Sequence, residues 1–135
     1  MSYPITDIEG IDNDVASILK SVRIRSTERL LEAASTVKGR KALAIRTGFD
    51  EKQLLRWANV ADRMRIRGIS KEYAELLKAA GVDTVKELKY RNPANLAKAM
   101  ADANRKRKMV RLLPSEKVVC RWIDSAKKLP LKITY

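Results

Sequence analysis

The feature that most constrains this chain is a short glycine pattern that occurs twice. Ile8-Glu9-Gly10-Ile11, with Ala16 after it, is matched by Ile66-Arg67-Gly68-Ile69, with Ala74 after it. Each copy leads into a segment whose apolar residues recur at helical spacing. We therefore expect a turn at each glycine and a helix directly after it. The first N–H groups of such a helix have no partner inside the helix, and they attract anions.

The repeat continues beyond the glycine turns. Leu19 matches Leu77 at the same spacing as the glycines, whereas Trp57 matches Trp122 at a longer spacing. The difference between the two spacings indicates an insertion in the second copy, near residues 103–113. We expect two diverged copies of one structural unit. Both tryptophans lie on predicted helices, and we expect them to pack in the core rather than to stack on bases.

The spacing of apolar residues is helical nearly everywhere, and β-branched alternation is scarce. Several helix starts are marked by residues that cap helices, namely Ser26, Asp50, Thr84 and Asn92 before Pro93. We predict an all-α fold of about eight to ten short helices, in repeats of about 1–64 and 65–135. Neither half could bury its apolar faces well alone, and no Gly/Ser/Pro-rich linker separates the halves. We therefore expect one compact domain over residues 1–135.

The charge of the chain indicates which partner it binds. Its 135 residues include 29 Lys and Arg against 16 Asp and Glu, which gives a formal net charge of +13. Residues 1–37 have a net charge of −2, and residues 38–135 a net charge of +15. A surface this basic favours nucleic-acid phosphates as its partner.

The sequence offers little for catalysis. It has no histidine, a single cysteine at position 120, and no clustered carboxylates that would hold a metal ion. We therefore expect no enzyme activity, no cofactor and no metal. No apolar run is long enough to span a bilayer, and the N-terminus lacks a secretory signal. We expect a cytoplasmic protein with no membrane partner, associated with the nucleoid if it binds DNA.

The glycine turns resemble the motif of the helix-hairpin-helix family, which reads roughly apolar-x-Gly-apolar-Gly, three residues, Ala, and a Leu/Ile face that often ends in Ala-Gly-apolar. Ile66–Ser70 with Ala74 and Ala80–Val82 matches this motif closely, and Ile8–Asp12 with Ala16 matches it more loosely. The whole chain is also similar to a group of small uncharacterised bacterial proteins built from tandem copies of this motif, as in the stretches Trp57–Asn59 and Gly81–Leu88.

This resemblance implies a fold of two tandem helix-hairpin-helix repeats, with a small helical fold of the SAM or 5′-exonuclease type as the nearest alternative. In the family, the amides of the hairpin bind DNA backbone phosphates without reading sequence. Carried over by position, that role falls on the residues Gly68, Ile69, Ser70 and Lys71, and in the first copy on Gly10, Ile11, Asp12 and Asn13.

Both copies depart from the family motif at its second glycine, which is replaced by Asp12 and Ser70. The Asp12 carboxylate can accept the first free N–H groups of its own helix, and its charge opposes a phosphate. We therefore expect the first hairpin to be structural. Ser70 is neutral, and its hydroxyl can cap the helix or donate to a phosphate oxygen. The second hairpin, which has basic residues around it, is the better candidate for binding an anion.

The densest run of charge is Arg105-Lys106-Arg107-Lys108, inside the inferred insertion. Four consecutive residues cover more than one helical turn and cannot all face one partner. The run is either a solvated helix end or a nonspecific phosphate clamp. The candidate nucleic-acid-binding residues are then Arg65, Arg67, Gly68, Ile69, Ser70, Lys71, Arg105, Lys106, Arg107 and Lys108.

The leading hypothesis is a non-catalytic protein that binds duplex DNA through backbone phosphates without sequence specificity. Two alternatives stay open. The repeats can form a protein-interaction module whose basic surface meets an acidic partner, or the same charges can bind structured RNA.

Overall fold

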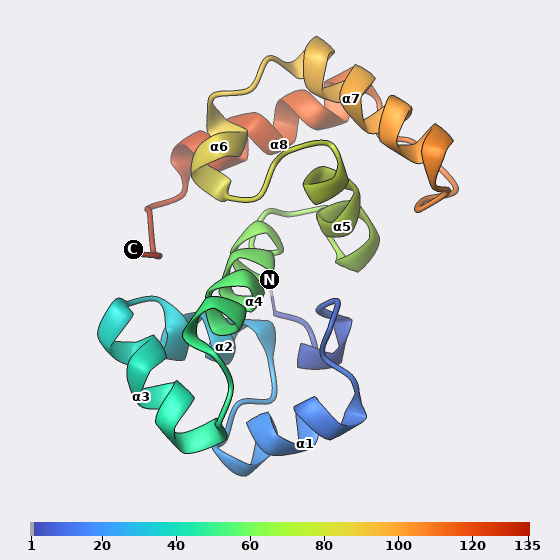
Figure 1. Cartoon of the computed structure of the whole chain (residues 1–135). Coiled ribbons are helices and arrows are strands. Elements are labelled where there is room, and N and C mark those ends of the chain that lie inside the picture. The colour runs from blue at the N-terminus through green and yellow to red at the C-terminus, as the bar shows by residue number, and fades with distance from the viewer. Residues whose placement is uncertain (1) are drawn as a thin grey trace.

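The computed structural model describes residues 2–135, and in this part of the chain it contains eight α-helices, one short 3-10 helix and no β-strand (Figure 1). The all-α prediction is therefore confirmed. The first half consists of η1 (Ile5–Asp7), α1 (Asn13–Ser21), α2 (Thr27–Ala34), α3 (Val37–Thr47) and α4 (Glu51–Arg63). The second half consists of α5 (Lys71–Ala79), α6 (Val85–Lys89), α7 (Pro93–Lys106) and α8 (Glu116–Lys128).

The two halves lie at opposite ends of a compact molecule. In Figure 1, α1 to α3 gather at one end, α5 to α8 gather at the other, and α4 runs between them. Helix α4 packs mainly on α2, and α8 packs on α6 and α7. The buried apolar residues of both halves nevertheless form one continuous cluster. Trp57 and Trp122 belong to this cluster, each 3% exposed, which confirms their predicted place in the core.

The duplication is visible in the backbone. Helices α1 and α5 have the same length, and both follow a glycine in the left-handed region, Gly10 at φ +92° and Gly68 at φ +93°. The same hydrogen bond closes each turn, from Ile11 N to Ile8 O at 3.1 Å and from Ile69 N to Ile66 O at 3.0 Å. Helices α4 and α8 also have equal lengths, and each carries its tryptophan at the same position within the helix. Each sequence match thus corresponds to a structural match.

The extra length of the second half lies in α7 and in the segment after it. Helix α7 has 14 residues against 11 in α3. The chain between α7 and α8 covers residues 107–115, whereas α3 and α4 are joined by residues 48–50 alone. This is the region in which the spacing of the repeat predicted an insertion.

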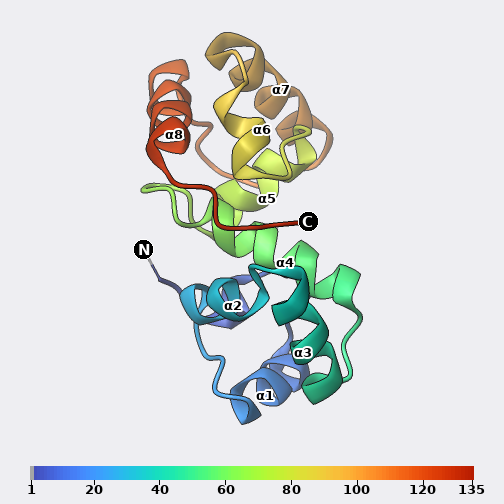
Figure 2. The same cartoon turned by 90° about the vertical axis from the view of Figure 1, so that its left-hand side faces the viewer.

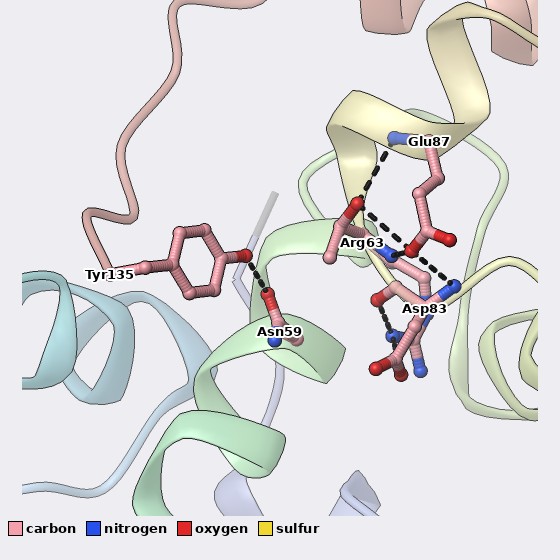
Figure 3. A network of polar contacts seen from close by, with 6 residues as sticks. Asn59, Arg63, Asp83, Glu87 and Tyr135 are labelled. Atoms are coloured by element: carbon pink, nitrogen blue, oxygen red, sulfur yellow. Dashed lines mark hydrogen bonds and ion pairs between the residues drawn. The ribbon is translucent and has the colours of Figure 1, made fainter.

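Buried polar groups join the two halves (Figure 3). The side chain of Arg63, at the end of α4, is 1% exposed, and its Nη1 donates to the backbone oxygen of Asp83 and lies 3.5 Å from the Asp83 carboxylate. Burial lowers the pKa of Arg63, and the nearby carboxylates of Asp83, Asp62 and Glu87 oppose this effect. The Nε of Arg63 is buried and makes no hydrogen bond within residues 2–135.

The C-terminal segment also connects the halves, because it crosses back over α4 to the first half (Figure 2). Thr134 N donates to Ser35 O at 2.8 Å, and the buried Arg40 donates from Nη2 to Thr134 O at 2.6 Å. The Tyr135 hydroxyl donates to Asn59 Oδ1 at 3.1 Å, as Figure 3 shows. Burial raises the pKa of this tyrosine, while its bond to Asn59 acts in the opposite direction.

Candidate nucleic-acid interface

The turn at Gly68 packs on the core on one side and faces solvent on the other. Ile69 is fully buried, and its amide is used inside the turn. A Cβ placed on Gly68 would lie 3.1 Å from Nε1 of Trp122, so the glycine rests on the indole of α8. Arg67, Gly68 and Ser70 are exposed. The core therefore fixes the turn while its outer side faces solvent.

The N-terminus of α5 has free backbone donors. Ser70 occupies the N-cap position in extended backbone, but its side chain makes no capping bond. Within residues 2–135, no group accepts a hydrogen bond from the amides of Gly68, Ser70 or Lys71. These N–H groups lie at the positive end of the α5 dipole, where an anion is stabilised.

The first hairpin differs from the second because its helix has a side-chain cap, as the sequence predicted for Asp12. Asp12 accepts a hydrogen bond from Val15 N at 2.9 Å and so caps α1 with its own carboxylate. The backbone turn is the same as in the second half, but an acidic side chain occupies the position next to the free donors. The chemical difference between Asp12 and Ser70 therefore leaves one helix start capped and the other without a side-chain cap.

A surface hollow of about 620 Å³ lies beside Gly68, between the turn and α8. Three cations line it: Arg67 from the turn, and Arg121 and Lys128 from α8. Asp124 is the one carboxylate among its lining residues. The charge of the hollow therefore favours an anion over a cation. Arg121 and Lys128 were absent from the predicted set, although the matched pairs Arg56-Trp57 and Arg121-Trp122 could have indicated Arg121.

An equivalent but smaller hollow of about 220 Å³ lies beside Gly10. Most of its lining residues are the repeat partners of those beside Gly68, with Trp57 under the glycine. Glu9 takes the place of Arg67, and Glu75 and Lys78 of α5 also line the hollow. Burial raises the pKa of Glu75, and the nearby charge of Glu9 raises it further. The hollow beside Gly10 thus has a carboxylate at its turn and is partly lined by the other half.

Arg65, predicted as part of the interface, is engaged elsewhere. Its Nε and Nη2 both lie 2.6 Å from Oδ1 of Asp62, and Nη2 also donates to Pro130 O at 3.2 Å. It lines a different hollow together with Leu129 and Lys132. Burial raises the pKa of Asp62, and the charge of Arg65 opposes that shift. The structure therefore separates Arg65 from the residues around Gly68.

The basic run lies at the end of α7 and lines a different hollow from the Gly68 turn. Arg105 and Lys106 end α7, Arg107 and Lys108 follow it, and all four are exposed. Arg105 forms an ion pair with Asp102 one turn earlier. Arg105 and Lys108 line a fourth hollow, which the Gly68 turn does not line. The predicted residues thus fall into three groups. The first is the exposed part of the turn, the second is Arg65 and Ile69, which bond within the chain, and the third is the basic run.

Two further properties concern residues 2–135. None of the helices in this range is long and apolar enough to cross a membrane. No three side chains of His, Cys, Asp or Glu in the same range gather into a group that could hold a metal ion.

Comparison with protein families assigns the chain to a family, and the match covers most of the sequence. The model of the family described as domain of unknown function DUF4332 matches residues 9–129, and the chain belongs to this family. No curated protein and no solved structure matches the chain.

Proposed function

We propose that this member of the DUF4332 family binds nucleic acid, duplex DNA above all, through backbone phosphates at the Gly68 turn. In this proposal the two halves are tandem helix-hairpin-helix repeats, and the second repeat makes the contact. A single observation carries the proposal: of two equivalent turns with free amides, one lies among cations and has no side-chain cap, while the other has a carboxylate cap and a glutamate.

The chemistry of the turn suits a phosphodiester. Phosphate oxygens accept hydrogen bonds from backbone N–H groups at a helix N-terminus. Arg67 and Lys71 lie on either side of these amides in the sequence, and Arg121 and Lys128 extend the positive charge across the neighbouring hollow. Each cation that neutralises a phosphate releases counterions and strengthens binding at low salt.

The backbone amides of the site suit phosphates rather than the edges of bases. Trp122 is buried under Gly68 and cannot stack on a base. Contacts to phosphates position a protein on nucleic acid but carry no sequence information. Binding without sequence preference follows from this arrangement.

The test is a salt titration with a charge-reversed protein. Arg67→Glu with Lys71→Glu should weaken binding to a random duplex at low salt by roughly tenfold or more. It should also reduce the slope of log K against log salt by about 0.9 for each phosphate that the variant no longer neutralises. Fluorescence anisotropy with a labelled duplex measures both quantities.

The matched control is Lys41→Glu with Arg46→Glu, which makes the same change of charge at exposed positions on α3. This control should lower affinity less and leave the slope nearly unchanged. Equal losses in the two double variants would show that only net charge matters and would remove the Gly68 turn from the interface. The same titration with single-stranded DNA and structured RNA identifies the preferred nucleic acid, and tighter binding of RNA would reassign the partner.

A further inference from the structure

One surface is not explained by phosphate binding. The hollow between α5 and the end of α7 has a volume of about 680 Å³ and is lined by apolar side chains from the inserted segment. Among them, Leu112 is 75% exposed and Leu113 is 40% exposed. A phosphate backbone has nothing apolar to offer these leucines, so their display in water indicates another partner.

The segment that carries the leucines is held in place. Asn104 Oδ1 accepts from Met109 N at 2.8 Å and from Val110 N at 3.1 Å, and Asn104 Nδ2 donates to Val110 O at 3.3 Å. The Tyr73 hydroxyl donates to Leu112 O at 2.8 Å. A surface fixed in this way loses little conformational entropy when a partner binds.

The charge around the hollow restricts the partner. Arg105, Lys108 and Arg111 line it, whereas Glu72 is the one carboxylate among its lining residues. Arg105 is paired with Asp102, which leaves Lys108 and Arg111 as the cations with no ion pair within residues 2–135. Apolar side chains between free cations suit a ligand that combines apolar groups with negative charge.

We infer that this hollow docks an acidic peptide segment of another protein, with apolar side chains against Leu112 and Leu113 and carboxylates on Lys108 and Arg111. A hollow of about 680 Å³ suits the side chains of a peptide better than the flat surface of a lipid bilayer. The inference goes beyond the proposed binding of nucleic acid and does not depend on it.

The test uses two short fluorescein-labelled peptides. In the first, pairs of glutamates alternate with pairs of leucines, and in the second, serine replaces every leucine. The wild-type protein should bind the first peptide about tenfold more tightly than the second, since burial of even one leucine side chain is worth about that factor. Leu112→Ser with Leu113→Ser should remove most of this preference, and Lys108→Glu with Arg111→Glu should weaken binding of the first peptide by a similar factor.

Ile45→Ser is the matched control, because Ile45 is 86% exposed on α3 and far from the hollow in sequence. It should bind both peptides as the wild type does. All variants change exposed residues, and circular dichroism melting verifies that they remain folded.

Three results would overturn the inference: equal affinity for the two peptides, no effect of the leucine substitutions, or leucine-dependent binding to phosphatidylserine vesicles without binding to the first peptide. The outcome is separate from that of the proposed function. Arg67→Glu with Lys71→Glu should retain peptide binding, and the leucine variant should retain DNA binding.

Discussion

Gly68 shows how a single residue connects the core to the candidate interface. Its φ of +93° lies in the region that favours glycine, and it rests on the indole nitrogen of the buried Trp122. A side chain here would be strained in the backbone and would also press against a ring that is packed in the core. The close approach of glycine and tryptophan therefore fixes the position of the free amides.

Gly68→Ala should lower the free energy of unfolding by about 2–3 kcal/mol, because it combines backbone strain with crowding against Trp122. Gly48→Ala is the matched control. Gly48 has φ +80°, but nothing lies within 4 Å of the place where its Cβ would be. This control should cost only about 1 kcal/mol. Urea denaturation measures both values, and equal costs would show that crowding against the indole contributes nothing.

Single residues were predictable from the sequence where their partners are near in the chain. Asp12 caps the helix that begins next to it, so its role followed from local spacing. Asp62, three residues before Arg65, was a partner that local spacing could have indicated, but Pro130 was not, because it lies far along the chain, after the last helix. The burial of Arg63 escaped prediction for the same reason, since Asp83 reaches it only in the folded chain.

At the scale of elements, α1 and α5 form a natural comparison. The two helices have the same length and follow the same turn, but Asp12 caps the first and the Ser70 side chain caps nothing. A side-chain cap stabilises the start of a helix, whereas a start without such a cap leaves its backbone donors available to a ligand. The uncapped start lacks a stabilising bond and keeps its donors free.

Asp12→Ala should lower the free energy of unfolding by about 1 kcal/mol, because it removes a capping bond. Ser70→Ala, the equivalent change in α5, should alter stability by less than about 0.5 kcal/mol, since no bond is removed. Thermal and urea unfolding of the two variants provide the comparison. A cost at Ser70 as large as that at Asp12 would mean that the hydroxyl caps α5 in solution.

Most helix starts were also predictable. Ser26, Asp50, Thr84 and Asn92 each accept the expected backbone N–H, because a cap acts within three residues of its own position. The insertion followed from the unequal spacing of the repeat. The difference between the two hollows could not be predicted, because Glu75 and Lys78 of α5, which line the hollow beside Gly10, lie far from that turn in the sequence.

At the scale of the whole molecule, the C-terminal segment and Arg63 hold the two halves together. Arg40 is 4% exposed and directs its guanidinium at the backbone oxygens of Ala34 and Thr134. Ile133 packs against the common core. The short interface between α4 and the second half is therefore reinforced by a segment that begins in one half and ends on the other.

Removal of residues 131–135 should lower the free energy of unfolding by roughly 2–4 kcal/mol, because Arg40 would lack one of its acceptors and Ile133 would be missing from the core. Tyr135→Phe deletes only the bond to Asn59 and should cost about 1 kcal/mol. Urea denaturation followed by circular dichroism measures both. Unchanged stability after truncation would show that the segment does not join the halves in solution.

The difference between the two hollows has a consequence for the number of binding sites on each molecule. The chain has two glycine turns of one design, but Glu75 and Lys78 of the second half also line the hollow beside the first turn. If the Gly68 turn binds a phosphate as proposed, each molecule offers one such site. In that case one molecule would bind along a single polyanion and would join two of them through these turns only if two molecules paired.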